Sequence, residues 1–322
     1  MKILVTGGSG FLGARLIPKL VDDGHQVFAL ARSKSSTDTV RSLGATPVQG
    51  DLDSPEELAL PAVDAVVHAA ALFRFAGPRA PYFRANVVGT QALLEAARRA
   101  GAATFVYISA AALVMEDRGT PLRNVDEAAP THPESFSGYI ASKSQGEAAV
   151  LAANQPGFRT IALRPPALWG PGSSFSKQLP SAVESGQFAF IARGEYQTST
   201  IHVDNVVEAV QCALERGSGG RPYFINDREL VTFREFVAGH AEAEGISIDG
   251  LRSLPYRIAF GLGRLLEALW ALRSDKSDPP LTRTMVRLIG REFTTNDTAA
   301  RHELGYVGTT TRAEGLAGLV HA

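Results

Sequence analysis

The feature that most constrains the fold is the glycine-rich stretch TGGSGFLG at residues 6–13. It follows the apolar run KILVT directly and opens the helical pattern FLGARLIPKLVDD, so it joins a predicted strand to a predicted helix. Gly7, Gly10 and Gly13 have the spacing G-x-x-G-x-x-G. In this context glycines let the backbone turn tightly and let a pyrophosphate reach the helix N-terminus. The stretch therefore predicts a dinucleotide-binding fold.

The first half of the chain alternates short apolar runs with helical patterns of about 10–15 residues, which favours a parallel sheet covered by helices on both faces. Predicted strands lie at 2–6, 26–32, 45–52, 64–70, 104–111 and 159–167, and predicted helices at 11–24, 86–101 and 138–153. The fold class is thus α/β, a Rossmann-type doubly wound parallel sheet with a smaller, mainly helical C-terminal part.

The alternation of predicted strands and helices stops after residue 168, and this change predicts the domain organisation. Residues 170–200 look rich in loops, and helices dominate from about 228. We expect a nucleotide-binding domain over 1–168, to which 201–226 return, and a substrate-binding part made of 169–200 and 227–322.

Composition excludes several classes of protein. With 45% hydrophobic residues and a net charge of −1, the chain can bury a core and lacks the basic excess of a nucleic-acid binder. Its single cysteine, Cys212, leaves no internal disulfide and no cysteine-based metal cluster, and no metal is expected. No secretory signal and no run of about 18 apolar residues is present, so we expect a cytoplasmic protein without a membrane span.

The end of the second strand indicates which dinucleotide is bound. An acidic side chain there would accept the ribose hydroxyls of NAD, but the strand ends with Ala31, Arg32 and Ser33, and we expect no acid within reach. Arg32 can pair with the 2′-phosphate of NADP. The sequence therefore favours NADP(H) over NAD(H).

Tyr139 and Lys143 lie four residues apart in the predicted helix 138–153, so their side chains share one helix face. A free phenol has a pKa of about 10, and a nearby ammonium favours the phenolate and lowers that value. Such a pair can exchange a proton with a substrate oxygen near neutral pH.

The order and spacing of several blocks together carry a resemblance that none of them carries alone. They are TGGSGFLG, GDL at 50–52, VVHAAA at 66–71, NVVGTQALLEAA at 86–97, YIASK at 139–143, LRPPALWGPG at 163–172 and IHVDNVVEAVQCAL at 201–214. The chain resembles the extended short-chain dehydrogenase/reductases, and within them the 3-beta-hydroxysteroid dehydrogenase branch. The resemblance covers nearly the whole chain.

The resemblance implies roles for individual residues. Tyr139 would be the proton donor and acceptor, and Lys143 would tune it and hold the nicotinamide ribose. The implied cofactor contacts come from Gly7, Gly10, Phe11, Leu12, Gly13, Arg32, Asp51, Leu52, Ala69, Ala70, Ala71, Lys143, Pro165 and Pro166.

One position departs from the family pattern. A serine or threonine is expected after the fifth strand, where it hydrogen-bonds the substrate oxygen, but Ala110 occupies that place and Ser109 precedes it. Either Ser109 serves instead, or another hydroxyl does, or the enzyme is slow on generic substrates. Losing such a donor costs roughly 2–4 kcal/mol of transition-state stabilisation.

Aromatic residues surround the expected substrate side, which suits a small hydrophobic carbonyl or alcohol substrate, although the same residues can be core. They are Phe73, Phe75, Tyr82, Phe83, Trp169, Phe175, Phe188, Phe190 and Tyr196. An amphipathic helix is predicted over 254–273, which can cover the pocket, join a subunit interface or contact a membrane surface; we expect it to cover the pocket. The family resemblance also implies a homodimer formed through helices of the sheet domain.

These observations predict an NADP-dependent oxidoreductase that interconverts a hydrophobic ketone and its secondary alcohol. Two alternatives stay open, a nucleotide-sugar epimerase or dehydratase, and a catalytically silent NADP-binding sensor. Arg32 and Ala110 count against the first alternative, and the intact pair Tyr139 and Lys143 counts against the second.

Overall fold

The computed structural model describes residues 1–54, 58–272 and 279–320, and a seven-stranded sheet forms its centre. Neighbouring strands of this sheet all pair in parallel, in the order β12-β7-β5-β4-β1-β2-β3. The strands are β1 (Lys2–Thr6), β2 (Gln26–Ala31), β3 (Thr46–Gln49), β4 (Ala65–His68), β5 (Thr104–Ile108), β7 (Arg159–Arg164) and β12 (Arg221–Phe224). The chain reverses its direction of travel across the sheet between β1 and β4, which confirms the predicted doubly wound α/β fold.

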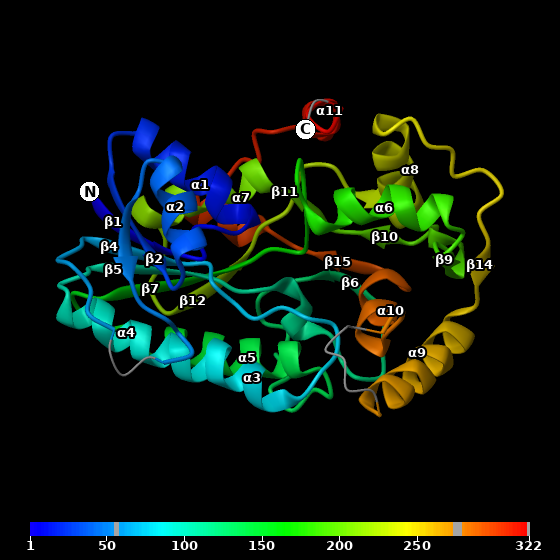
Figure 1. Cartoon of the computed structure of the whole chain (residues 1–322), viewed down its shortest axis with the longest axis horizontal. Coiled ribbons are helices and arrows are strands. Elements are labelled where there is room, and N and C mark those ends of the chain that lie inside the picture. The colour runs from blue at the N-terminus through cyan, green and yellow to red at the C-terminus, as the bar shows by residue number, and fades with distance from the viewer. Residues whose placement is uncertain (55–57, 273–278, 321–322) are drawn as a thin grey trace.

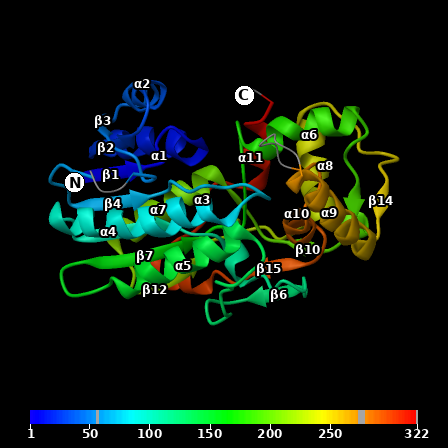
Figure 2. The same ribbon diagram turned by 60° about the horizontal axis from the view of Figure 1, so that its bottom comes forward.

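Helices cover both faces of this sheet (Figures 1 and 2). Helices α1 (Phe11–Asp22) and α7 (Val203–Glu215) pack on one face, and α4 (Gly89–Arg99) and α5 (Gly138–Ala152) pack on the other. Successive residues of a strand point to opposite faces, so Ile3 enters the core beneath α1 and α7 while Leu4 enters the core beneath α4 and α5. Burial on both faces explains why the strands are nearly continuous apolar runs.

The remaining elements lie outside the large sheet and its four covering helices, and α6, α8, α9 and α10 lie at the right of Figure 1. The further helices are α2 (Lys34–Ser42), α3 (Arg79–Phe83), α6 (Ser174–Glu184), α8 (Phe233–Ala243), α9 (Tyr256–Ala271), α10 (Arg283–Ile289) and α11 (Arg312–Ala317). The 3-10 and π segments are η2 (Arg84–Val88), η3 (Ala111–Val114), η4 (Ala192–Gly194) and η5 (Ala300–Leu304). The further strands are β6 (Leu122–Val125), β8 (Ala167–Trp169), β9 (Phe190–Ile191), β10 (Gln197–Thr198), β11 (Thr200–His202), β13 (Val231–Thr232), β14 (Ser253–Leu254) and β15 (Phe293–Thr295).

The loop-rich prediction for residues 170–200 was wrong for 174–184, which form α6. The hydroxyl of Ser173 accepts a hydrogen bond from the Ser176 amide at 3.1 Å and caps this helix. Serines and Pro180 within the helix weaken its sequence signal, whereas burial of Leu179 against α8 stabilises it. Tertiary packing therefore decides this helix.

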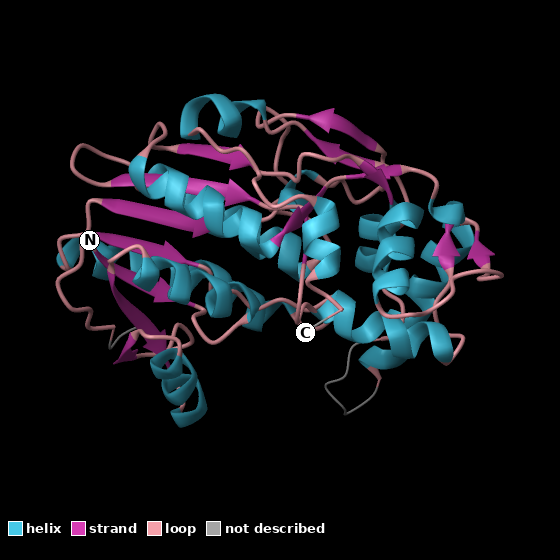
Figure 3. Ribbon diagram, turned by 90° about the horizontal axis from the view of Figure 1, so that it is seen from above, coloured by secondary structure: helices cyan, strands magenta, loops and turns pink. Residues whose placement is uncertain are grey.

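Segments far apart in the sequence form a second, four-stranded sheet in the order β13-β10-β15-β6. Helix α10 is tied to the loop after η3, because the buried guanidinium of Arg287 donates to the Met115 carbonyl and lies 3.3 Å from the Asp117 carboxylate. The carboxyl ends of the large-sheet strands point toward this part of the molecule (Figure 3). The proposed division of the chain at residue 168 stays a prediction.

Candidate active site

The residues predicted to bind the cofactor lie along the side of the large sheet where its strands have their carboxyl ends, called here the carboxyl edge. Each follows the carboxyl end of a parallel strand, with the glycine-rich loop after β1, Arg32 after β2, Ala69 after β4 and Pro165 after β7. The strands end nearly level, since Thr6 of β1 is in register with His68 of β4. In doubly wound folds, ligands bind at this edge, beside the point where the strand order reverses.

The glycine-rich loop leaves no room for side chains. Gly7 has a φ of +72°, and a Cβ there would lie 2.8 Å from the Ala70 amide nitrogen. A Cβ on Gly13 would lie 2.4 Å from the Gly7 carbonyl oxygen, so only glycine lets α1 pack this closely on the loop. Gly10 is the N-cap of α1 and offers no side-chain cap to the first amides of that helix. These features fit a phosphate group of a dinucleotide.

The other residues predicted to bind the cofactor, in the glycine-rich loop and in the turn after β4, differ in solvent exposure. Leu12 is buried in the core under α1, whereas Phe11 is half-buried. Ala69 and Ala70 are half-buried beside Gly7, and the Ala70 amide donates to the Thr6 hydroxyl at 3.1 Å. The loop after β4 is thereby held against the glycine-rich loop. Ala71 is exposed beyond it.

Arg32 is exposed at the end of β2, as a 2′-phosphate contact requires, but an acidic side chain lies beside it. The Asp53 carboxylate, from the turn after β3, lies 3.6 Å from the Arg32 guanidinium. The expectation that no acid lies within reach was therefore wrong, because Asp53 is distant in sequence and approaches only through the pairing of β2 with β3. Asp51 caps the same turn, since its carboxylate accepts from the Asp53 amide at 3.0 Å.

Leu52 and the two prolines also lie around this edge. Leu52 is half-buried against the start of α4, where its carbonyl faces Gly89. Pro165 is buried, and its carbonyl accepts from the Ala111 amide at 2.8 Å, which joins the end of β7 to η3. Pro166 is half-buried.

Tyr139 and Lys143 lie one turn apart on α5, and the structure brings Lys143 to the end of β5. The Lys143 ammonium donates to the Ile108 carbonyl at 2.6 Å and lies 3.9 Å from the centre of the Tyr107 ring. Lys143 is only 1% exposed. The Tyr139 ring is half-buried and meets the edge of the Phe73 ring, with 4.8 Å between the ring centres.

Burial is the largest influence on the pKa values of both Tyr139 and Lys143. It lowers the pKa of Lys143 to about 7, although the nearby Glu147 carboxylate acts in the opposite direction. Burial also raises the pKa of Tyr139 above its ordinary value. The expected lowering of the Tyr139 pKa by Lys143 was therefore wrong for this structure, because withdrawal of water disfavours the phenolate.

Ser109 directs its hydroxyl into the protein interior. The hydroxyl donates to the Glu147 carboxylate at 2.6 Å, and Ser109 is buried. To bond a substrate oxygen, Ser109 would have to leave Glu147. Ala110, at the position where the family places the hydroxyl, is also buried and packs near Tyr139.

Sequence reasoning missed a histidine beneath this edge. His68 is fully buried between two hydroxyls, with Thr6 Oγ1 2.7 Å from its Nδ1 and Thr90 Oγ1 2.9 Å from its Nε2. Burial lowers the pKa of His68 to about 3, so the ring stays neutral. His68 thus ties β1 and β4 to α4 below the candidate site. Its place in the block VVHAAA was the available signal.

Only part of the predicted aromatic wall lies near Tyr139 and Lys143. Phe73 is 51% exposed and contacts both Phe75 and Tyr139. Most of the others are core residues: Trp169, Phe175, Phe188, Phe190 and Tyr196 belong to the cluster around α8, and Tyr82 is buried. Their sequence spacing does not distinguish a pocket wall from a core.

Helix α9 lies at the margin of the molecule (Figure 1) and carries a stripe of exposed apolar side chains. The stripe consists of Ile258, Leu262, Leu265, Leu269 and Leu272. The opposite face of the helix, with Ala259 and Gly263, is buried and packs against α10. Arg273, the last residue of the helix predicted over 254–273, lies outside the described residues. No helix within the described ranges is long and apolar enough to cross a bilayer.

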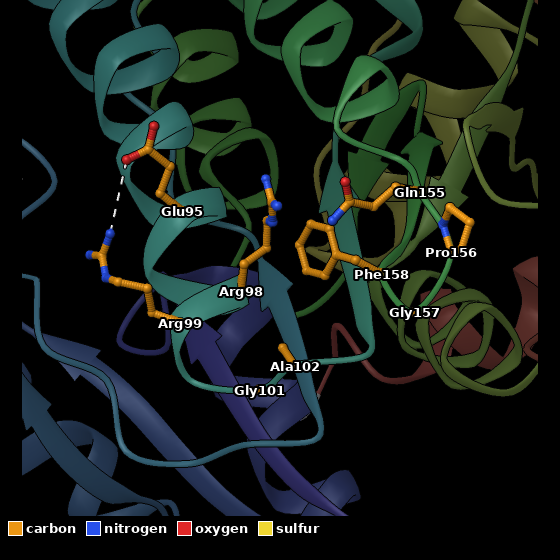
Figure 4. Close-up of a pocket in the computed structure, with 9 residues that line it drawn as sticks. All are labelled: Glu95, Arg98, Arg99, Gly101, Ala102, Gln155, Pro156, Gly157 and Phe158. Carbon is orange, nitrogen blue, oxygen red and sulfur yellow. Dashed lines mark ion pairs between the residues drawn. The ribbon is translucent and has the colours of Figure 1, made fainter.

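A cavity of ≈ 580 Å³ lies at the opposite edge of the sheet (Figure 4). Arg98 and Arg99 from the end of α4 border it, together with Gln155 and Phe158 from the turn before β7. This edge carries the amino ends of β5 and β7, so the cavity takes no part in the candidate site.

Comparison with known proteins agrees with the geometry. The model of the 3-beta hydroxysteroid dehydrogenase/isomerase family matches residues 4–256. The chain belongs to this family. It is therefore an oxidoreductase of the extended short-chain dehydrogenase/reductase class, as the sequence predicted.

Two named relatives match along nearly their whole length. A 4-hydroxy-2-methyl-3-oxo-4-farnesyl-3,4-dihydroquinoline-1-oxide ketoreductase of Stigmatella aurantiaca is 41% identical, over 100% of this chain and 96% of that protein. A 2-alkyl-3-oxoalkanoate reductase of Stenotrophomonas maltophilia is 33% identical, over 98% of this chain and 97% of that protein. Among solved structures, a dTDP-glucose 4,6-dehydratase of Streptomyces venezuelae has a TM-score of 0.76 at 22% identity, over 100% of this chain and 96% of that one, and shows the shared fold.

Proposed function

We propose that this chain is an NADP-dependent oxidoreductase that interconverts a hydrophobic ketone and its secondary alcohol. The observation that carries the proposal is the placement of Tyr139 and Lys143 on adjacent turns of α5, beside the end of β5. The glycine-rich loop lies at the same edge of the sheet. A proton donor and a dinucleotide cradle at one edge are what carbonyl reduction requires.

The residues at this edge fit a bound dinucleotide. Its pyrophosphate would lie on the uncapped start of α1, which Gly7 and Gly13 allow to pack closely against the glycine-rich loop and the turn after β4. Arg32 would meet the 2′-phosphate of NADP, and the lining of Ala69, Ala70 and Asp51 would face the adenosine. When bound, the cofactor supplies a hydride to the carbonyl carbon or accepts one from the alcohol carbon.

Tyr139 supplies the proton in the reductive direction. Its O–H bond breaks as the substrate oxygen takes the proton, while the carbonyl carbon takes the hydride, so that a ketone becomes an alcohol. Because burial raises the pKa of Tyr139, the phenol carries its proton at neutral pH. The Lys143 cation then stabilises the phenolate that is left behind.

The two named relatives suggest the substrate class. In the substrates for which both relatives are named, the oxo group stands next to the carbon that carries an apolar chain, which is farnesyl in one and alkyl in the other. We extend this class to the present chain, as a ketone with a long apolar substituent on the neighbouring carbon. The exposed ring of Phe73, packed on Tyr139, is suitably placed to contact such a chain.

The bond from Ser109 to Glu147 favours a second candidate, the catalytically silent NADP-binding sensor, because it leaves the substrate oxygen without that hydroxyl. The test is oxidation of NADPH and of NADH with a panel of ketones: 2-alkyl-3-oxo esters, unsubstituted 3-oxo esters, aryl ketones and steroidal ketones. We expect turnover with NADPH and preference for the 2-alkyl members. Tight NADPH binding without turnover on any member would instead support the sensor.

Two expectations about partners belong to the same proposal. One is a homodimer formed through sheet-domain helices such as α4. The other concerns α9, which we expect to cover the substrate pocket; contact of its exposed stripe with a membrane surface is the alternative. A cytoplasmic location likewise stays a prediction.

A further inference from the structure

Behind the catalytic pair lies a buried cluster of charges. The Glu147 carboxylate accepts from the Arg164 guanidinium at 2.6 Å and 3.0 Å and from the Ser109 hydroxyl at 2.6 Å. The side chains of Arg164 and Glu147 are only 4% and 2% exposed. Removing two charges from water this completely is costly, and a well-packed apolar pair would serve stability equally well. The cluster therefore calls for a role besides stability.

Glu147 joins three chain segments that surround the proposed reacting centre. It lies on α5 one turn after Lys143, as Lys143 lies one turn after Tyr139, so the three side chains share one helix face. Arg164 is the last residue of β7, directly before Pro165. Ser109 directly follows β5. One carboxylate thus holds α5, the end of β5 and the end of β7 in place.

We propose that Glu147 is a positioning residue for the reaction, which supplies the negative charge that keeps Lys143 a cation and fixes α5 against β5 and β7. Arg164 and Ser109 hold Glu147 in place. This assigns Ser109 to the support of Lys143 rather than to the substrate oxygen, and so accounts for the departure at Ala110. The effect of Glu147 on the reaction rests on the proposed function, whereas its effect on the protonation of Lys143 does not.

Among the groups around Lys143, Glu147 is the one whose negative charge favours a protonated Lys143. From α5 these groups are Glu147 and, one turn before Lys143, Tyr139; from β4 the neutral imidazole of His68; and from β5 the phenol of Tyr107. The Arg164 cation of β7 lies behind them, bonded to Glu147. The phenols and the imidazole carry no charge near neutral pH, because burial raises the pKa of both phenols and lowers that of His68. Glu147 is therefore the anion that opposes the loss of the Lys143 proton.

The first test measures the titration of Lys143 directly. Lysine labelled with ¹³C at Cε gives few signals, because the chain has only six lysines, and the Lys143 signal is assigned by its loss in a Lys143→Arg variant. We expect a midpoint near pH 7 in the unmodified protein. In Glu147→Gln we expect it to fall by about 1 pH unit or more, as on removal of a close opposite charge. An unchanged midpoint would overturn the inference.

Two variants guard against a merely structural effect. Asp227→Asn neutralises another buried carboxylate, which is bonded to Trp169 and His202 away from Lys143, and should leave the Lys143 midpoint unchanged. If Glu147→Gln does not fold with Arg164 unpaired, the double variant E147Q/R164Q replaces the ion pair by two amides. A smaller fall is expected there, because the Arg164 cation, which disfavours a charged Lys143, is lost together with the carboxylate, and a rise of the midpoint would contradict the inference.

The second test measures catalysis. In NADPH-dependent reduction, kcat/KM should decline with rising pH as Lys143 loses its proton, and Glu147→Gln should move this decline to lower pH. Glu147→Asp keeps the charge and should restore the original profile. A protein that reduces no ketone but shows the shifted Lys143 titration would refute the proposed function alone. A shared pH profile for Glu147→Gln and the unmodified enzyme would refute the positioning role alone.

Discussion

At the scale of single residues, the proposed mechanism depends on one O–H bond, that of Tyr139. Replacing it by phenylalanine keeps the ring that packs on Phe73 but removes the proton donor. We expect kcat to fall by about 10²–10⁴-fold, the usual contribution of a positioned acid. The dissociation constant for NADPH should stay nearly unchanged, which fluorescence titration can check. Full turnover by Tyr139→Phe would contradict the mechanism.

We expect Arg32, with Asp53 beside it, to set the preference between the two dinucleotides. Arg32→Ala should weaken NADPH binding by about tenfold, the value of one charge-assisted contact of about 1.5 kcal/mol, and leave NADH binding unchanged. Asp53→Asn removes the carboxylate 3.6 Å from Arg32 and should strengthen NADPH binding. Isothermal titration with both cofactors measures these effects. If both variants bind NADPH as the unmodified protein does, Arg32 is a surface residue without a role in the site.

At the scale of elements, α9 has one packed face and one exposed face. Ala259 is fully buried, so Ala259→Leu should overpack the contact with α10 and cost about 1–3 kcal/mol. Leu265 is 56% exposed on the opposite face, and Leu265→Ala should change the free energy of unfolding by less than about 0.5 kcal/mol. Urea unfolding of the two variants tests this. Equal losses would mean that the exposed stripe is covered in solution, for example in a homodimer.

At the scale of the whole molecule, two buried histidines should make the free energy of unfolding fall as the pH falls. Burial lowers the pKa of His68, beneath the large sheet, to about 3 and that of His240, in the C-terminal part, to about 4. Between pH 6.5 and these values the unfolded chain binds protons that the folded chain does not, so stability falls as pH falls. From pH 6.5 to pH 5 each histidine should remove about 2 kcal/mol.

The measurement is urea unfolding at pH 7 and at pH 5. His240→Gln should reduce the difference in unfolding free energy between the two conditions by about 2 kcal/mol, because the contribution of His240 is then lost. An unaltered difference in that variant would show that His240 is protonated in the folded protein.

The sequence alone determined the features that depend on neighbouring residues. The turn at Gly7, the alternation of strands and helices, and the helical spacing of Tyr139 and Lys143 are all local. Their physical causes act over a few residues: backbone sterics, strand and helix periodicity, and the shared helix face. The large sheet and the family could therefore be predicted, and the structure and the comparisons confirm both.

Tertiary structure decided what depends on groups that meet across the chain. Asp53 reaches Arg32 only through the pairing of β2 with β3, and Ser109 reaches Glu147 only because α5 packs beside the end of β5. Burial, likewise a property of the whole fold, reverses the expected shift of the Tyr139 pKa. It also separates Phe73 from the aromatic residues of the core. Desolvation and charge pairing act through space, so sequence distance does not reveal them.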